Sequence, residues 1–233
     1  MEHTSNPARD VMAESSPARD TGHGTAPVDA VILDWGNVLH RWEAHRAVEG
    51  RVEPAVWEEM TTTGEFTRWN RLWDAGATLE EVLAAVGAEQ PVRTDKVEAM
   101  RTYWEHFDET LTEPVPGTVP LVRALLDAGT PLYCLTNFNH LLWHHGRERV
   151  PELARFHGVV VSGEERLVKP DARLYRRLLD RYGLAAGRTL FVDDSAANTA
   201  GAGAVGLVTH HFTTADALHE DLAARGLLPT AVD

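Results

Sequence analysis

Five short apolar runs constrain the fold more than any other feature of this 233-residue sequence. They lie at residues 30–34 (AVILD), 131–137 (PLYCLTN), 158–163 (GVVVSG), 189–194 (TLFVDD) and 206–211 (GLVTHH). None of them alternates apolar with polar residues, so each predicts a β-strand that is buried on both faces. Helical patterns separate the last four runs, and strands that alternate with helices favour a parallel sheet. We therefore expect an α/β fold in which helices cover both faces of a parallel sheet.

A long segment, residues 42–114, separates the first run from the rest and shows helical patterns but no strand pattern. A structureless loop of this length would be unusual in a compact domain, whereas a helical insert would not. We therefore expect a core formed by residues 28–41 and 115–233. The segment contains five of the seven tryptophans, which are Trp42, Trp57, Trp69, Trp73 and Trp104. They predict a small core within the insert, and one or two of them could line a pocket that faces the sheet.

Composition excludes several classes of function. The net charge of −13 argues against non-specific binding to nucleic acid, which needs a basic face. No apolar stretch reaches the roughly 18–20 residues of a membrane span. Residues 1–27 are polar, rich in Ser, Pro, Gly and Ala, and predict a disordered tail rather than a signal peptide. The single cysteine, Cys134, predicts a buried thiol and fits a cytoplasmic protein.

Polar side chains gather at the points where the predicted strands end or shortly after them. They are Asp34, Thr136, Asn137, Lys169, Asp193 and Asp194. Ligands bind beyond the carboxyl ends of the strands in an open parallel sheet. We therefore expect these six residues, which are far apart in the sequence, to meet at one edge of the sheet.

The chemistry of this set favours phosphoryl transfer. Its three carboxylates would repel one another unless a cation bridges them, and hard oxygen ligands suit Mg²⁺. The hydroxyl of Thr136, nearby backbone N–H groups and the ammonium of Lys169 would hold an anion. Asp34 would then be a nucleophile that forms an aspartyl-phosphate. The partner that this arrangement predicts is a small phosphorylated substrate.

Four motifs in this chain resemble those of the haloacid dehalogenase superfamily, in particular its phosphatase-like members with a helical cap inserted after the first strand. They are ILDWGNVL, CLTN, VKPD and FVDDSAAN, which occur in the family's order. The resemblance spans about residues 30–225. It implies a Rossmann-like parallel core and an all-helical cap at residues 42–114.

The resemblance also implies roles for individual residues. Asp34 would be the nucleophile, Thr136 and Asn137 would bind phosphate, and Lys169 would stabilise the charges of phosphate and nucleophile. The implied Mg²⁺ site consists of Asp34, the carbonyl of Gly36, Asp193 and Asp194. Within it Asp194 would bind the ion directly and Asp193 would be a second acid beside it. Asn198 would orient Asp194 or Lys169.

Gly36 is the main departure from the family pattern. Phosphatases of the family usually carry a second Asp two residues after the nucleophile, as general acid and base, and losing such a group costs about 10²–10⁴ in rate. A substrate with a good leaving group, such as an anomeric or acyl phosphate, would need no replacement. Alternatively a residue of the insert or a nearby loop, such as His40 or Glu43, would supply the proton. A third explanation is that the site binds its ligand without turnover.

The function that these observations favour is a Mg²⁺-dependent hydrolase that removes phosphate from a small phosphomonoester. A subgroup with the motif D-x-G-N-V is similar to sugar-phosphate phosphatases, which makes a sugar phosphate one expected substrate. One alternative is a 2-haloacid dehalogenase, which uses the same nucleophile, but the paired acids Asp193 and Asp194 speak against it because that reaction needs no metal. The other alternative is a phospho-ligand-binding pseudoenzyme.

Overall fold

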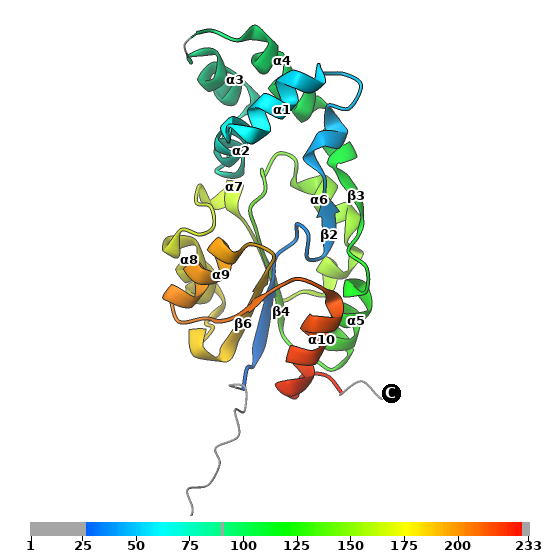
Figure 1. The fold of residues 1–233 in the computed structure, drawn as a ribbon. Coiled ribbons are helices and arrows are strands. Elements are labelled where there is room, and N and C mark those ends of the chain that lie inside the picture. Colours follow the sequence, from blue (N-terminus) through cyan, green and yellow to red (C-terminus); the bar gives the residue numbers. More distant parts are fainter. Residues whose placement is uncertain (1–26, 90, 230–233) are drawn as a thin grey trace, which may run out of the picture.

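The computed structural model describes residues 27–89 and 91–229 (Figure 1). The tail predicted at residues 1–27 lies, apart from Pro27, outside the described residues. Within the described part of the chain, no helix combines the length and apolar character that crossing a membrane requires.

Five parallel strands form the central sheet, in the order β5-β4-β1-β6-β7. They are β1 (Ala30–Leu33), β4 (Leu132–Thr136), β5 (Gly158–Val161), β6 (Thr189–Asp193) and β7 (Val208–His211). All five coincide with the apolar runs, so the predicted parallel α/β fold is confirmed. Because β1 lies between β4 and β6, the residues that follow these three strands meet at the middle of one edge of the sheet.

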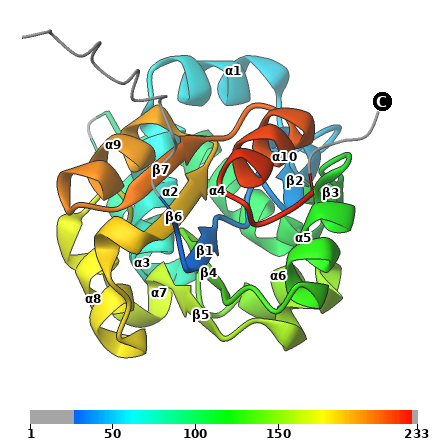
Figure 2. The ribbon, with the colours of Figure 1, turned by 90° about the horizontal axis from the view of Figure 1, so that it is seen from below.

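Helices cover both faces of the sheet (Figures 1 and 2). One face carries α5 (Thr118–Asp127) and α10 (Ala215–Ala224), and the other carries α8 (Ala172–Tyr182) and α9 (Ala196–Ala204). Neighbouring residues of β1 point to opposite faces: Val31 belongs to the apolar cluster that contains α5 and α10, and Ile32 to the one that contains α8. This double burial explains why β1, β4 and β6 are buried along their whole length. The edge strand β7 differs from the expectation, because none of its four residues is fully buried.

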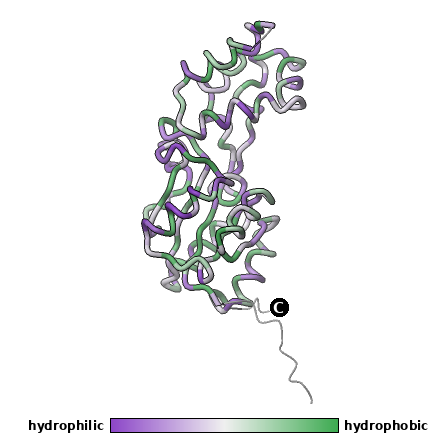
Figure 3. Tube along the Cα trace, turned by 90° about the vertical axis from the view of Figure 1, so that its left-hand side faces the viewer, coloured by the Kyte–Doolittle hydropathy of each residue, from purple (hydrophilic) through white to green (hydrophobic). Residues whose placement is uncertain are grey.

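The chain between β1 and α5 extends beyond the carboxyl ends of the strands and forms a helical bundle at the top of Figure 1. We call residues 43–110 the helical insert. It contains η1 (Ala44–Ala47), α1 (Pro54–Thr62), α2 (Glu65–Asp74), α3 (Leu79–Gly87), α4 (Thr94–Glu105) and η2 (Phe107–Thr110). Figure 3 shows apolar segments in the sheet and in the insert alike. The fully buried side chains of the insert include Met60, Trp69 and Tyr103, so it has an interior of its own.

The sequence did not predict the two strands at the base of the insert. These strands, β2 (His40–Trp42) and β3 (Leu111–Pro114), form an antiparallel ribbon in which Trp42 lies opposite Leu111. Only the first residue of β3 is buried, so this strand lacks an apolar pattern and forms because the two ends of the insert meet. The remaining elements are α6 (Trp143–Arg149), η3 (Pro151–Arg155), α7 (Ser162–Glu165) and η4 (Ala186–Arg188).

Candidate active site

Lys169 lies between two carboxylates at the edge of the sheet. Its Nζ is 2.8 Å from Oδ1 of Asp34, which follows β1, and 2.7 Å from Oδ2 of Asp193, which ends β6. The same ammonium donates a 3.0 Å hydrogen bond to the carbonyl of Leu135 in β4. The Lys169 side chain is fully buried. Burial alone would lower the pKa of Lys169, but Asp34 and Asp193 hold the pKa above its usual value, so the ammonium stays charged.

Three carboxylates form an acidic group beside this lysine. Oxygen atoms of Asp34, Asp193 and Asp194 all lie within 4.8 Å of one another. Burial raises the pKa of Asp34 above its usual range, against the opposing charge of Lys169. Burial also raises the pKa of Asp194. A divalent cation bound between the three carboxylates would offset the free energy that burial and mutual repulsion add to their ionisation. Because all the donor atoms are carboxylate oxygens, the group fits Mg²⁺.

Asn198 contacts a different residue from the two that the sequence suggested. Its Nδ2 donates to both oxygens of Asp193, at 3.0 and 3.2 Å, and not to Asp194 or Lys169. The reason is local: Ser195 caps α9, which places Asn198 in the first turn with its side chain directed back at the strand end. Asp193 also accepts the backbone N–H of Ser195. Its oxygens are therefore largely occupied, whereas Asp194 is held by fewer donors.

Thr136 ends β4 and Asn137 follows it, so both lie at the strand end, where the side chain of Asn137 has a protein partner. Thr136 is buried and lines the cavity described below. The side chain of Asn137 forms a reciprocal pair with the backbone of Lys169: its Nδ2 donates to the carbonyl at 3.2 Å, and its Oδ1 accepts the N–H at 2.8 Å. Asn137 therefore positions Lys169.

Asn37 is a site residue to which the sequence analysis assigned no role. Its Nδ2 donates to Oδ2 of Asp194 at 3.1 Å, and its Oδ1 accepts the backbone N–H of Trp42 at 3.1 Å. The residue has a φ of 55°, in the left-handed region that asparagine tolerates better than most residues. The pair Gly36-Asn37 is a typical turn composition, which is the signal that would have indicated it.

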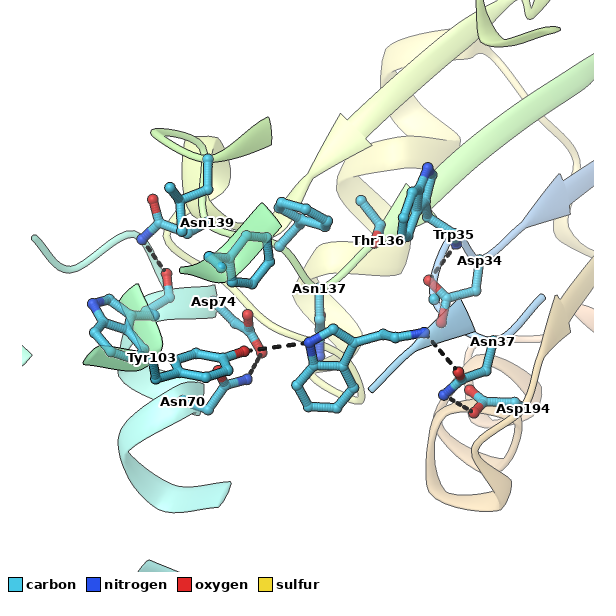
Figure 4. Close-up of a pocket in the computed structure, with 16 residues that line it drawn as sticks. Asp34, Trp35, Asn37, Asn70, Asp74, Tyr103, Thr136, Asn137, Asn139 and Asp194 are labelled. Atoms are coloured by element: carbon cyan, nitrogen blue, oxygen red, sulfur yellow. Dashed lines mark hydrogen bonds between the residues drawn. The ribbon is translucent and has the colours of Figure 1, made fainter. Parts of the chain in front are cut away.

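A cavity of about 200 Å³ lies between the strand ends and the helical insert (Figure 4). Asp34, Gly36, Thr136 and Asp194 line its core side. The other walls are largely apolar and contain Trp35, Trp42, Trp73, Tyr103, Phe107, Phe138 and Leu142. Two of the five tryptophans of residues 42–114, Trp42 and Trp73, therefore line the pocket, as expected.

The replacements suggested for the missing acid do not line this cavity. His40 is buried and stacks on Trp35, with 5.2 Å between the ring centroids. Glu43 pairs with Arg46 on the surface. A different acid, Asp74, does line the cavity. It was missed because it ends an amphipathic helix, where an acid next to a buried residue normally faces solvent.

Comparisons with known proteins agree with this geometry. Residues 28–206 match the model of the haloacid dehalogenase-like hydrolase family. The sesquiterpene phosphatase astK of Aspergillus oryzae is 37% identical over 186 residues, which cover 79% of this chain and 89% of that protein.

Solved structures show the same fold. The HAD family enzyme bt-2542 from Bacteroides thetaiotaomicron has a TM-score of 0.64 at 19% identity, covering 81% of this chain and 95% of that one. The wild-type form of that enzyme in complex with magnesium and inorganic phosphate has a TM-score of 0.58 at 18% identity, covering 80% and 95%. The family model spans most of the chain, and the four motifs meet at one site. This protein therefore belongs to the haloacid dehalogenase-like hydrolase family.

Proposed function

We propose that this protein is a Mg²⁺-dependent phosphatase that hydrolyses a phosphomonoester with an apolar alcohol group. The observation that carries this proposal is the contact of Asp34 with Lys169 at the polar end of a cavity whose other walls are mainly aromatic. The activity in the name of the relative astK and the magnesium and phosphate bound by bt-2542 both support it. Two solved dehalogenase structures share the fold at 20% and 18% identity, but neither dehalogenation nor binding without turnover is better supported than phosphate hydrolysis.

In this proposal Asp34 attacks the phosphorus, the ester bond to the alcohol breaks, and water later hydrolyses the aspartyl-phosphate. Lys169 favours the ionised form of the attacking carboxylate against the effect of burial, while Asp193 and Asn137 hold Lys169 in place. The hydroxyl of Thr136 donates to a phosphoryl oxygen. Mg²⁺ held by Asp34, Asp194 and the carbonyl of Gly36 would neutralise charge that develops on the transferred group.

The cavity favours an apolar alcohol over the sugar considered from the sequence alone. A sugar needs several free hydrogen-bonding groups, but most polar side chains in the walls already have protein partners. The amide of Asn139 donates to the carbonyls of Trp73 and Ala77 and accepts from Leu141. The remaining wall is aromatic or aliphatic, and burial of a hydrocarbon group against it would be favourable. A terpenoid-like alcohol meets this description.

Phosphate release tests the proposed activity directly. The protein is assayed with an isoprenyl monophosphate, a sugar phosphate, an acyl phosphate and a 2-haloacid, each with Mg²⁺ and with EDTA. We expect phosphate release that is highest for the isoprenyl monophosphate, that EDTA abolishes and that excess Mg²⁺ restores. Halide release in EDTA would contradict the proposal in favour of a dehalogenase. Ligand-dependent thermal stabilisation without turnover on any substrate would favour the pseudoenzyme.

Leu142 offers a test of the apolar wall. It lines the cavity, whereas its neighbour Leu141 is 47% exposed. Leu142→Asn should lower kcat/KM for the isoprenyl monophosphate by about 10–100-fold. This factor corresponds to the free energy gained by burying one aliphatic side chain. The same variant should change kcat/KM for acetyl phosphate little, because that substrate does not reach the wall. Leu141→Asn is the matched control, and equal losses on both substrates would argue against an apolar alcohol site.

Two further expectations remain part of the proposal. We propose that residues 42–114 act as a cap that excludes water from the cavity, with 28–41 and 115–233 as the catalytic core. We also propose a cytoplasmic location, which the free and buried Cys134 supports.

A further inference from the structure

Asp74 is a cavity-lining acid that the mechanism above does not use. It is the last residue of α2 and lines the same cavity as Asp34. Figure 4 shows it on the insert side, between Tyr103 and Asn137 and across the cavity from Asp34. A group that binds to Asp34 from within this cavity would therefore lie between the two carboxyl groups.

The end of α2 is fixed to the core, so Asp74 has a defined position. Asn139 donates to the carbonyl of Trp73 at 2.8 Å, and the hydroxyl of Ser162 donates to the carbonyl of Asp74 at 2.5 Å. The next turn approaches the core so closely that a Cβ on Gly76 would lie 2.4 Å from the carbonyl oxygen of Gly163. Gly76 also has a φ of +87°, which favours glycine there.

The surroundings of Asp74 suit a group that gains and loses a proton. Within the described residues, its carboxyl group forms no ion pair and accepts one side-chain hydrogen bond, from Asn70 Nδ2 at 3.2 Å. The other charged or titratable groups that face it are Arg71 on its own helix, Lys169 of the core and Tyr103 of α4. Burial raises the pKa of Asp74 to about 7, although Lys169 and Arg71 act in the opposite direction. Both protonation states are therefore accessible near neutral pH.

We propose that Asp74 is the general acid and base of this site and supplies from the insert the carboxyl group that position 36 lacks. This inference rests on the proposed phosphatase function. When Asp34 attacks and the P–O ester bond breaks, the proton of Asp74 passes to the ester oxygen and the alcohol leaves. Water then attacks the aspartyl-phosphate and gives its proton to the Asp74 carboxylate. The P–O bond to Asp34 breaks, which restores both carboxyl groups and releases inorganic phosphate.

Asp74→Asn tests this role with two leaving groups. Alkyl phosphates need a proton on the departing oxygen, whereas a nitrophenyl phosphate does not. In single-turnover experiments, Asp74→Asn should slow alcohol release from an alkyl phosphate by about 10²–10⁴-fold. Nitrophenol release should fall by less than about tenfold and end after one equivalent, because the variant lacks the base for the second step. In wild-type protein, alcohol release should decline above pH 7, and this decline should be absent in Asp74→Asn.

Two further variants control for folding and position. Asp180→Asn is the matched control, because Asp180 is exposed on α8. A Cβ on Gly36 would meet no atom within 4 Å, so the first side-chain atom of Gly36→Asp causes no clash. In the Asp74→Asn background, Gly36→Asp should restore alcohol release from the alkyl phosphate at least tenfold, because it returns a carboxyl group beside the ester oxygen.

The pH dependence of stability measures whether the pKa of Asp74 is raised in the folded protein. The pKa of Asp74 is raised in the folded state, so the protein takes up a proton on folding between about pH 4 and 7. The free energy of unfolding of the wild-type protein therefore falls as pH rises through this range. The Tm of Asp74→Asn relative to wild type should therefore rise between pH 5 and pH 8.

Three outcomes would overturn the inference. The first is that Asp74→Asn releases alcohol from an alkyl phosphate at the wild-type rate. The second is that Asp74→Asn slows release of both leaving groups by the same factor and shows no nitrophenol burst. In either case phosphate release that still requires Asp34 would leave the proposed function intact. A wild-type protein that releases no phosphate from any substrate would overturn both.

Discussion

Asp34→Asn should reduce phosphate release by at least about 10⁴-fold while the protein stays folded, because an amide cannot act as the nucleophile. Trp35 N–H donates to Asp34 Oδ1 at 2.6 Å, and the asparagine carbonyl can accept the same bond. Lys169 would keep Asp193 as its partner at 2.7 Å, so the ammonium would not be left unpaired. The substitution therefore removes the reactive group with little change to its surroundings.

The measurement is kcat for the preferred phosphomonoester with saturating Mg²⁺, together with mass spectrometry of acid-quenched protein. Wild-type protein should carry one phosphoryl group during turnover, and Asp34→Asn should carry none. Asp180→Asn again serves as the control, because it makes the same chemical change on the surface. An Asp34→Asn variant that retains more than about a hundredth of the activity would contradict covalent catalysis by this residue.

The parts that could be predicted from the sequence share one physical origin. A strand buried on both faces must be apolar throughout, so β1, β4 and β6 were visible as runs such as AVIL and LYCLT. Polar residues directly after such runs stand out, because a charge there is costly without a partner. Asp34 and Asp193 are examples, and each has Lys169 as a partner.

The parts that could not be predicted depend on contacts between distant segments. The β2–β3 ribbon joins residues about 70 positions apart through pairs such as His40 with Pro114, and β3 has no apolar pattern of its own. Asn198 was assigned to the wrong partner because sequence spacing indicates its turn of α9 but not its side-chain direction. Asp74 enters the site only because the end of α2 docks on the core, and no local pattern encodes that contact.

Lys169→Met should destabilise the protein by about 3–5 kcal/mol at neutral pH, the usual effect of removing one member of a buried ion pair. The side chain is fully buried, and its Nζ is 2.8 Å from Asp34 and 2.7 Å from Asp193. Methionine has a similar length and would fill the space beside Phe191, whose ring centroid is 5.7 Å from the ammonium. The loss would therefore come mainly from two carboxylates left without their counter-charge. Urea unfolding at several pH values measures it.

The pH dependence of this loss identifies its cause. Without Lys169, the pKa of Asp34 should rise further, because the lysine charge no longer opposes the effect of burial. A carboxyl group with a raised folded-state pKa costs stability as pH rises, so the difference between Lys169→Met and wild type should be smaller at pH 5 than at pH 8. Adding Asp193→Asn to Lys169→Met should recover part of the loss, because one unpaired charge disappears. A loss that is independent of pH and unchanged by Asp193→Asn would instead assign the effect to packing of the lysine stem.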